Sequence, residues 1–186
     1  MDFVTIETNR LMLKGIAPEQ MRHLFETFEK AEIKRILGHR SDEDFEKEAY
    51  KHKNGYSSYN RSFILFLLTH KASETIIGRC GIHNWNMEHK RAEIGYVMHD
   101  LDFRCKGLMT EALGAILEYG FKQLNLNRIE ALVGAGNTPS LRLMEKFKFV
   151  REGILRQHML ANGQFEDSIL FSKLIGEYGS GFNAGV

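Results

Sequence analysis

The stretch Arg104-Cys105-Lys106-Gly107-Leu108-Met109 leads into Thr110–Leu124, where apolar residues recur at helical spacing. This spacing predicts an amphipathic helix that starts just after a glycine. The start of a helix presents unpaired backbone N–H groups at the positive end of the helix dipole, so the stretch is a candidate anion site. Gly107 allows a sharp turn and close approach of a ligand, and Arg104 and Lys106 add positive charge. An ordinary helix start with two solvated basic side chains would show the same pattern.

The residues on either side of this helix predict the central part of a sheet. Arg91–Met98 and Arg128–Val133 are predicted strands, and together with the helix they form a β-α-β unit that should be a right-handed parallel crossover. Two further strands, Ser62–Thr69 and Thr75–Trp85, precede the unit. Because short polar turns connect these strands, we expect antiparallel neighbours there.

The N-terminal part predicts one strand and two helices. Ile6–Lys14 is interpreted as a strand because Leu11 and Leu13 alternate with polar residues. Apolar residues at helical spacing then predict a helix from Pro18 to Gly38. Ser41 is the expected N-cap of a second helix, which has an acidic first turn.

The C-terminal part predicts a short helix over Ser140–Phe147, followed by a hairpin of Ile154–Leu160 and Ser168–Leu174. The sequence Ala161-Asn162-Gly163-Gln164 has the residue types expected of the turn in this hairpin. The expected order is therefore β-α-α-β-β-β-α-β-α-β-β. This order predicts an α/β (α+β) fold with a mixed, mostly antiparallel sheet. We expect one domain over residues 1–178 and a flexible C-terminal tail over 179–186.

The composition is that of an ordinary globular domain of 186 residues, with 43% hydrophobic and 26% charged residues. The 25 basic and 24 acidic residues give a net charge of +1, which is not the signature of a nucleic-acid-binding protein. The apolar run Phe63–Leu68 is too short to cross a membrane. Two cysteines without a C-x-x-C pair argue against a zinc ribbon or a disulfide scaffold, and no signal peptide is evident. We therefore expect a cytoplasmic protein without a membrane partner.

Several motifs together resemble one known family. The sequence lacks a P-loop and a G-x-G-x-x-G motif. Arg104–Ala112 instead resembles the coenzyme A pyrophosphate loop of the GNAT N-acetyltransferase superfamily, whose pattern is Q/R-x-x-G-x-G/A, and Ala92–Tyr96 resembles its fourth strand. Four later elements resemble the ribosomal-protein N-terminal acetyltransferase (RimJ/RimL-like) subgroup: Asn137–Ser140, Leu143–Phe149, Glu152-Gly153 and Asn162–Asp167. Met109 and Lys148 depart from the pattern, since small residues are usual at both positions.

The resemblance implies direct acetyl transfer from acetyl-CoA to a primary amine, with pantetheine in the gap between a splayed pair of parallel strands. It assigns the backbone of Val97 and Met98 to pantetheine. The implied pyrophosphate site is made by Arg104, Cys105, Lys106, Gly107, Leu108, Met109 and Thr110. It also implies that Asn137 holds the pantetheine arm and that Ser140 protonates the departing thiolate. Without the resemblance, Asn137 would be interpreted as a turn residue and Ser140 as a helix cap.

Two residues are candidates for the general base that receives the amine proton. Glu93 lies on the predicted fourth strand, where related enzymes often have a carboxylate, although a strand-surface Glu is an equal alternative. His158 lies on a late strand and titrates near neutral pH, and a structural role is the alternative there. Tyr96 and Trp85 are expected either in an acceptor pocket or in the core. No histidine has metal-ligand spacing, His83, His89 and His99 included, so we predict no metal.

The resemblance leaves the acceptor open: the α-amine of a protein or a small-molecule amine. A non-catalytic acyl-CoA-binding sensor of the same fold is the alternative function, and transfer of a longer acyl chain is a third possibility. The acceptor is expected near Ile33–Gly38 and Tyr56–Asn60. A monomer and a homodimer are both compatible with the sequence.

Overall fold

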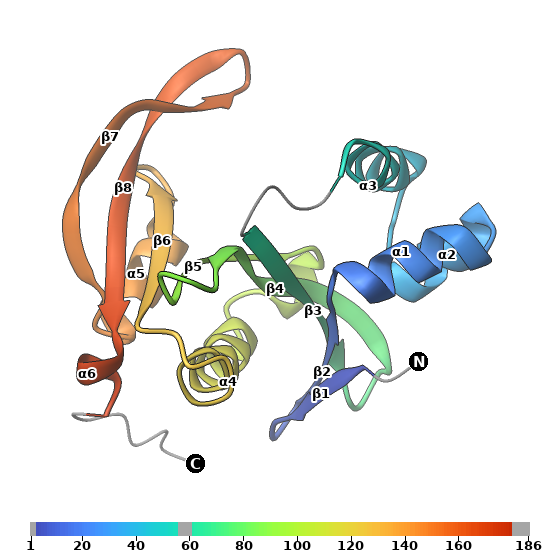
Figure 1. Ribbon diagram of the computed structural model, residues 1–186, viewed down its shortest axis with the longest axis horizontal. Helices are drawn as coiled ribbons and strands as arrows, with labels where there is room; N and C mark the ends of the chain where they lie inside the picture. The colour runs from blue at the N-terminus through green and yellow to red at the C-terminus, as the bar shows by residue number, and fades with distance from the viewer. Residues whose placement is uncertain (1–2, 56–60, 180–186) are drawn as a thin grey trace.

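A computed structural model describes residues 3–55 and 61–179, which form an open sheet with helices on both of its faces (Figure 1). The sheet order is β1-β2-β3-β4-β5-β6-β8-β7, and all neighbours are antiparallel except β5 and β6. The strands are β1 Val4–Glu7, β2 Leu11–Ile16, β3 Arg61–His70, β4 Thr75–Asn86, β5 Arg91–Met98, β6 Arg128–Gly134, β7 Val150–Ala161 and β8 Gln164–Leu174.

The helices form two layers over this sheet. They are α1 Pro18–Thr27, α2 Lys30–Leu37, α3 Asp42–Asn54, α4 Leu108–Lys122, α5 Thr138–Lys146 and α6 Ile175–Tyr178, with a 3₁₀ turn at Leu101–Phe103. The larger core packs α4 and α5 against β2 to β6. Ala112, Leu113, Ile116 and Leu117 form the buried face of α4 and are 0% exposed. The smaller core packs α1 and α2 against the other face of the sheet. The predicted fold class is confirmed.

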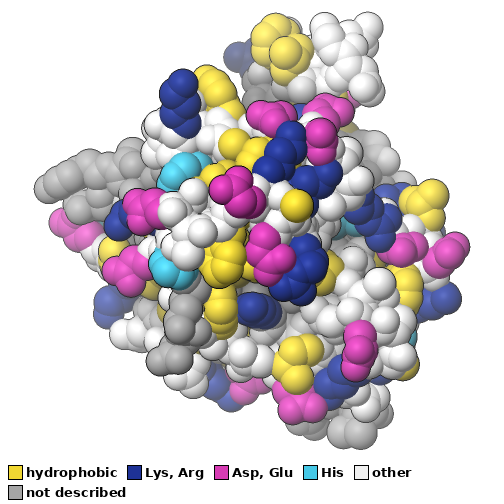
Figure 2. Space-filling model, turned by 90° about the vertical axis from the view of Figure 1, so that its right-hand side faces the viewer, with side chains coloured by type: hydrophobic (Ala, Val, Ile, Leu, Met, Phe, Trp, Pro, Cys, Tyr) yellow, Lys and Arg dark blue, Asp and Glu magenta, His cyan; other side chains and the backbone are white. Residues whose placement is uncertain are grey.

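Ion pairs join α2 to α3 outside the smaller core. Lys34 Nζ lies 2.5 Å from Asp42 Oδ1, and Lys30 Nζ lies 2.9 Å from Glu46 Oε1. Figure 2, which views the molecule from the side of these helices, shows basic and acidic side chains interspersed over this face. Exposed pairs of this kind contribute little stability each, so the apolar stripe beneath them is the main reason that α2 and α3 dock.

Two N-terminal predictions were wrong because a turn interrupts a continuous pattern. The strand predicted over Ile6–Lys14 is the hairpin of β1 and β2, in which the Leu11 N–H and the Thr8 hydroxyl are 3.1 Å apart. The helix predicted from Pro18 to Gly38 is two helices, because the backbone is extended at Phe28 and Glu29. Both helices pack their apolar faces on the same core, so the apolar spacing alone did not reveal the break.

Other local predictions are confirmed. The Ser41 hydroxyl accepts a hydrogen bond from the Asp44 N–H at 3.1 Å and caps α3. The turn of the long β7–β8 hairpin places Asn162 at φ 50° and Gly163 at φ 78°, the signs that a type I′ turn requires. Lys148 adopts the left-handed conformation at φ 53°, so the turn after α5 forms without the usual glycine.

Candidate active site

The parallel pair at the centre of the sheet separates partway along its length. Arg91, Ala92 and Glu93 of β5 pair with residues 128–130 of β6. Beyond Glu93, β5 pairs with β4 as far as Met98, while β6 pairs with β8 as far as Gly134. Across the described parts of both strands no later β5–β6 pair forms. One edge of each strand is therefore open to a ligand lying between them.

The two faces of β5 present different surroundings at this opening. Ala92, Ile94 and Tyr96 belong to the larger core on the α4 side. Because side chains alternate along a strand, Glu93, Gly95 and Val97 face the side of α1 to α3. There, a cavity of about 480 Å³ is lined by β3, β4, β5 and α3, and Gly95 and Val97 contribute to its wall. The opening thus has a core-facing side and a cavity-facing side.

The loop before α4 has the geometry expected of an anion site. Cys105 and Gly107 both have positive φ, 59° and 76°, which turns the chain sharply into the helix. Gly107 is the N-cap of α4, and in the described structure no side chain caps this helix end. Residues 104–107 are exposed. An exposed loop followed by a helix start without a side-chain cap meets two requirements of anion binding.

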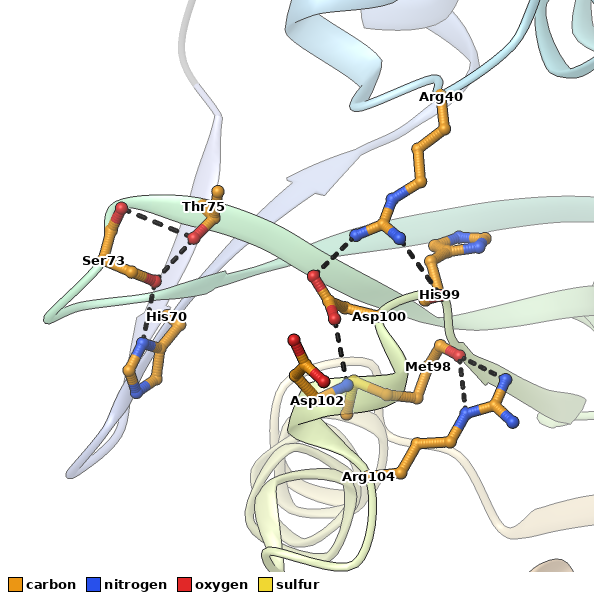
Figure 3. Close-up of polar contacts among 9 residues, drawn as sticks. All are labelled: Arg40, His70, Ser73, Thr75, Met98, His99, Asp100, Asp102 and Arg104. Atoms are coloured by element: carbon orange, nitrogen blue, oxygen red, sulfur yellow. Dashed lines mark hydrogen bonds and ion pairs between the residues drawn. The ribbon is translucent and has the colours of Figure 1, made fainter.

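The two basic residues of the loop differ in their contacts. The Arg104 guanidinium donates to the Met98 carbonyl through Nε and Nη2, at 3.3 and 3.0 Å (Figure 3). This bond ties the loop to the end of β5. Lys106 Nζ lies 5.6 Å from the centre of the Phe103 ring, and its side chain is exposed. Both basic side chains are exposed, and Arg104 is the one that is tied to the backbone of β5.

Arg10 is a third cation at this loop, and the sequence analysis missed it. Its Nη1 donates to the Lys106 carbonyl at 2.9 Å, and its Nε pairs with Glu111 of α4 at 2.7 Å. The Thr8 hydroxyl also donates to Glu111, at 2.7 Å. Burial raises the pKa of Glu111, but these hydrogen bonds outweigh it and hold the pKa below its usual value. The residues are about a hundred positions apart, so no local motif indicates the contact.

Ser140 and Asn137 lie at the start of α5, on the core side. Asn137 is the N-cap: its Oδ1 accepts the Ser140 N–H at 3.2 Å. The helix begins at Thr138, two residues before the predicted start, so interpreting Ser140 as the cap was wrong.

Burial raises the pKa of Tyr96, and the nearby Ser140 hydroxyl opposes part of that rise. The buried Tyr96 Oη has no hydrogen-bond partner among the described residues. The structure therefore brings Tyr96 and Ser140 together.

Glu93 lies in a polar group on the cavity side. Its Oε2 accepts a hydrogen bond from Asn84 Nδ2 at 3.0 Å and lies 3.8 Å from His83 Nδ1. A β-carbon on Gly95 would lie 2.8 Å from His83 Nε2, so the imidazole occupies the space that a side chain at position 95 would need. The sequence analysis considered His83 only as a metal ligand. Its position beside Glu93 could have been found from the antiparallel register, which pairs the two residues.

His158, the other predicted base, lies elsewhere. It is in the irregular part of β7 between Leu155 and Met159, and its Nδ1 is 3.1 Å from Ser168 Oγ. Strands β8 and β6 stand between β7 and β5 in the sheet. The structure therefore groups Glu93 with His83 and not with His158.

The described residues present neither a candidate metal centre nor a candidate membrane-spanning helix. Within residues 3–55 and 61–179, no three His, Cys, Asp or Glu side chains cluster as metal ligands would. None of the helices in the same ranges is long and apolar enough to cross a membrane. Cys80 is buried, which raises its pKa, whereas Cys105 is exposed in the loop before α4.

Comparison with known proteins identifies the class to which this fold and this opening belong. Residues 10–150 match the family model described as an acetyltransferase (GNAT) domain. The uncharacterized N-acetyltransferase YoaA of Bacillus subtilis (strain 168) is 32% identical over 91% of this chain and 96% of its own length. The uncharacterized N-acetyltransferase p20 of Bacillus licheniformis is 42% identical over 61% of this chain. That match spans 63% of p20, which is less than two thirds of it.

A solved structure supports the fold. A spermidine N-acetyltransferase from Vibrio cholerae superimposes with a TM-score of 0.67 at 22% identity, covering 93% of this chain and 98% of that one. At this identity the likeness concerns the fold alone. From the match over residues 10–150, this chain belongs to the GNAT acetyltransferase family. The expected enzyme class, an N-acetyltransferase, is confirmed at this level.

Proposed function

We propose that this protein transfers the acetyl group of acetyl-CoA directly to a primary amine, on the α-amine of a protein or on a small molecule. The observation that best supports this proposal is that β5 and β6 separate after Glu93, and that the start of α4 has no side-chain cap among the described residues. A strand opening of this kind offers backbone groups to an extended pantetheine arm, and the helix start offers N–H groups to a pyrophosphate. The resemblance to the ribosomal-protein (RimJ/RimL-like) subgroup is part of this proposal and is compatible with both kinds of acceptor.

Coenzyme A would be held mainly by the backbone. The N–H groups of residues 104–109, with Thr110 behind them, bind the pyrophosphate, and Lys106 and Arg10 supply positive charge nearby. The open edge of β5 at Val97 and Met98 receives the pantetheine arm. Since Asn137 Oδ1 is used in the helix cap, Asn137 binds the arm through its Nδ2 hydrogens.

Transfer needs a neutral amine, a polarised thioester carbonyl and a proton for the leaving thiolate. The amine nitrogen attacks the carbonyl carbon, the carbon–sulfur bond breaks and the thiolate takes a proton. Glu93 receives the amine proton, directly or through the His83 side chain next to it. Ser140 donates a proton to the thiolate from the other side of the opening. His158 becomes the base only if Glu93 proves dispensable.

The first experiment measures thermal melting with acetyl-CoA. Ligand at a hundred times its dissociation constant stabilises the native state by about 2.7 kcal/mol. For a chain of this size that is a rise of roughly 5–10 °C. Pantetheine, which lacks the pyrophosphate, is the matched control and should give a much smaller rise. No shift at saturating acetyl-CoA would contradict the proposal.

The second experiment separates an enzyme from the non-catalytic sensor of the same fold. Release of free coenzyme A is followed with a panel of peptide N-termini and small amines. Turnover that is lost in Glu93→Gln, with acetyl-CoA binding retained, supports the catalytic proposal. A protein that binds acetyl-CoA but turns over no amine would be the sensor.

A further inference from the structure

The cavity on the α3 side of β5 has an unbalanced charge. Among its described lining residues, three side chains are basic, those of Lys51, Arg61 and Arg79, and one is acidic, that of Glu48; Glu93 lies beside the opposite end of the cavity. Residues 56–60, which lie outside the described ranges, contain no Lys, Arg, Asp or Glu. A pocket built for an amine alone does not need this surplus of positive charge, because ammonium and guanidinium groups repel a protonated amine.

We propose that the acceptor is a small amine that also carries an anionic group, a carboxylate or a phosphate, and that Arg79 binds this group. The inference rests on the proposed function, since it assumes that the cavity receives the acceptor. Its volume of about 480 Å³ is in the range of small-molecule sites. The anionic oxygens would lie at the basic end of the cavity, and the amine would lie toward Glu93.

Arg79 is placed to bind an anion. Its side chain is 16% exposed, and its Nη1 lies 3.9 Å from Glu48 Oε2, longer than a good hydrogen bond. Among the described residues its buried Nε has no hydrogen-bond partner. A guanidinium removed from water is costly unless its donors are satisfied, and a carboxylate or phosphate could supply the missing acceptors in the planar geometry that arginine favours.

Glu48 offsets part of the positive charge at the basic end of the cavity. Its Oε2 is 3.6 Å from Lys51 Nζ and 3.9 Å from Arg79 Nη1, and the charge of Asp44 also acts on Arg79. Arg61 adds a further positive charge at the start of β3. An acceptor with an anionic group would restore the balance, whereas a polyamine would increase the surplus.

The floor of the cavity connects the basic end to the proposed site of transfer. Gly81 of β4 is paired with Gly95 of β5, and the His83 imidazole occupies the space that a side chain at position 95 would need. Alternation places Arg79, Gly81 and His83 on one face of β4, and the Cα atoms of Arg79 and His83 are about 13 Å apart. An acceptor that spans this depression can hold its anion at Arg79 and its amine beside His83 and Glu93.

Binding of three amines of equal length tests the proposal. 6-Aminohexanoate carries an anion, 1-aminohexane has no second charge and 1,6-diaminohexane carries a second cation. Calorimetry on the protein saturated with CoA should show 6-aminohexanoate binding about tenfold more tightly than 1-aminohexane or better, because a hydrogen bond to a charged group is among the stronger ones. 1,6-Diaminohexane should bind most weakly. 6-Aminohexyl phosphate distinguishes a phosphate site from a carboxylate site.

Variants locate the preference. Arg79→Gln should abolish the advantage of 6-aminohexanoate, and Arg79→Lys should keep part of it. Lys47→Gln is the matched control, because Lys47 lies on α3 but pairs with Glu43 away from the cavity, and it should leave the preference unchanged. Arg79 is largely buried, so Lys51→Gln and Arg61→Gln, at less buried positions, provide a second test if Arg79→Gln does not fold. Each should reduce the preference several-fold.

Four results would each overturn the proposal. They are equal affinity for the three amines, tightest binding of the diamine, no binding of any of the three, and a preference for 6-aminohexanoate that survives both sets of variants. Melting with acetyl-CoA separates this result from the proposed function. A shift with acetyl-CoA but no preference for the anionic amine refutes only the acceptor class. No shift with acetyl-CoA refutes the proposed function itself.

Discussion

Two substitutions of Gly107, in the loop before α4, distinguish the effect of backbone strain on stability from the effect of an added negative charge on acetyl-CoA binding. Gly107 has φ 76° and caps the helix. A β-carbon there would lie 3.5 Å from Arg10 Nη2, an ordinary contact, so the space admits a side chain. Asn and Asp have nearly the same shape and tolerate this conformation better than other residues. The pair Gly107→Asn and Gly107→Asp therefore differs mainly in one negative charge.

The expected magnitudes follow from this geometry. Either substitution places a non-glycine residue in the left-handed region, at a cost of about 1 kcal/mol in folding free energy. For a chain of this size the melting temperature should fall by roughly 2–4 °C in both variants. Asp alone adds a charge next to the proposed pyrophosphate. At a separation of a few ångströms in a half-solvated site the repulsion is about 1–3 kcal/mol, or roughly ten- to a hundredfold in affinity.

The assay measures melting without ligand and acetyl-CoA affinity by calorimetry. We expect equal stability of the two variants, near-normal affinity for Asn and strongly reduced affinity for Asp. Raising the salt concentration should narrow the difference, because the site is exposed. If Asp binds acetyl-CoA as tightly as Asn does, the pyrophosphate does not lie at this helix start, and the assignment of residues 104–110 is refuted.

Four further predictions concern other parts of the molecule. Ser140→Ala should lower kcat more than acetyl-CoA affinity. Tyr96→Phe, which removes the buried hydroxyl near Ser140, should shift the pH profile of kcat, and an unchanged profile would mean that Tyr96 only contributes to packing. Burial, with the charge of Arg79, lowers the pKa of His39 to about 4. The free energy of unfolding that is due to neutral His39 is therefore fully present above the unfolded-state pKa of about 6.5. It is lost as the pH falls toward 4, by up to about 3 kcal/mol. The free energy of unfolding of His39→Phe, measured in urea, should depend less on pH in that window. Lys148→Gly should raise the unfolding free energy by about 0.5–1 kcal/mol by relieving the left-handed backbone at φ 53°, and a loss of stability would contradict this view of the turn.

The sequence predicted those parts of the fold that depend on local chemistry. The Ser41 cap, the glycine before α4 and the Asn162-Gly163 turn each have a residue type that the backbone requires, and each was found. The hairpin of β1 and β2 was missed, because its turn at residues 8–10 contains neither glycine nor proline and depends on the Thr8 side chain.

The site was predictable to a different extent on the two sides of the strand opening. The loop before α4 could be proposed from the sequence because a ligand bound by backbone N–H groups constrains glycine and the helix start, which remain visible in a sequence. Arg10 was not assigned to the site, and Tyr96 was expected either in an acceptor pocket or in the core. Their places beside Lys106 and Ser140 arise from packing between distant segments. His83 and Glu93 lie ten positions apart and meet only through the β4–β5 register.

This difference has a physical consequence for specificity. On the coenzyme side the proposed contacts come from the backbone, so many side chains are compatible with the same cofactor. On the cavity side, Gly81 of β4 and Gly95 of β5 contribute no side chains to the floor of the cavity. The charged side chains that line it come from α3, β3 and β4. If the proposed roles hold, changing Lys51, Arg61 or Arg79 would alter the acceptor without disturbing the helix start to which we assign the cofactor. The acceptor is therefore the property that family membership determines least, and the charge of this cavity is the feature of the chain that bears on it most directly.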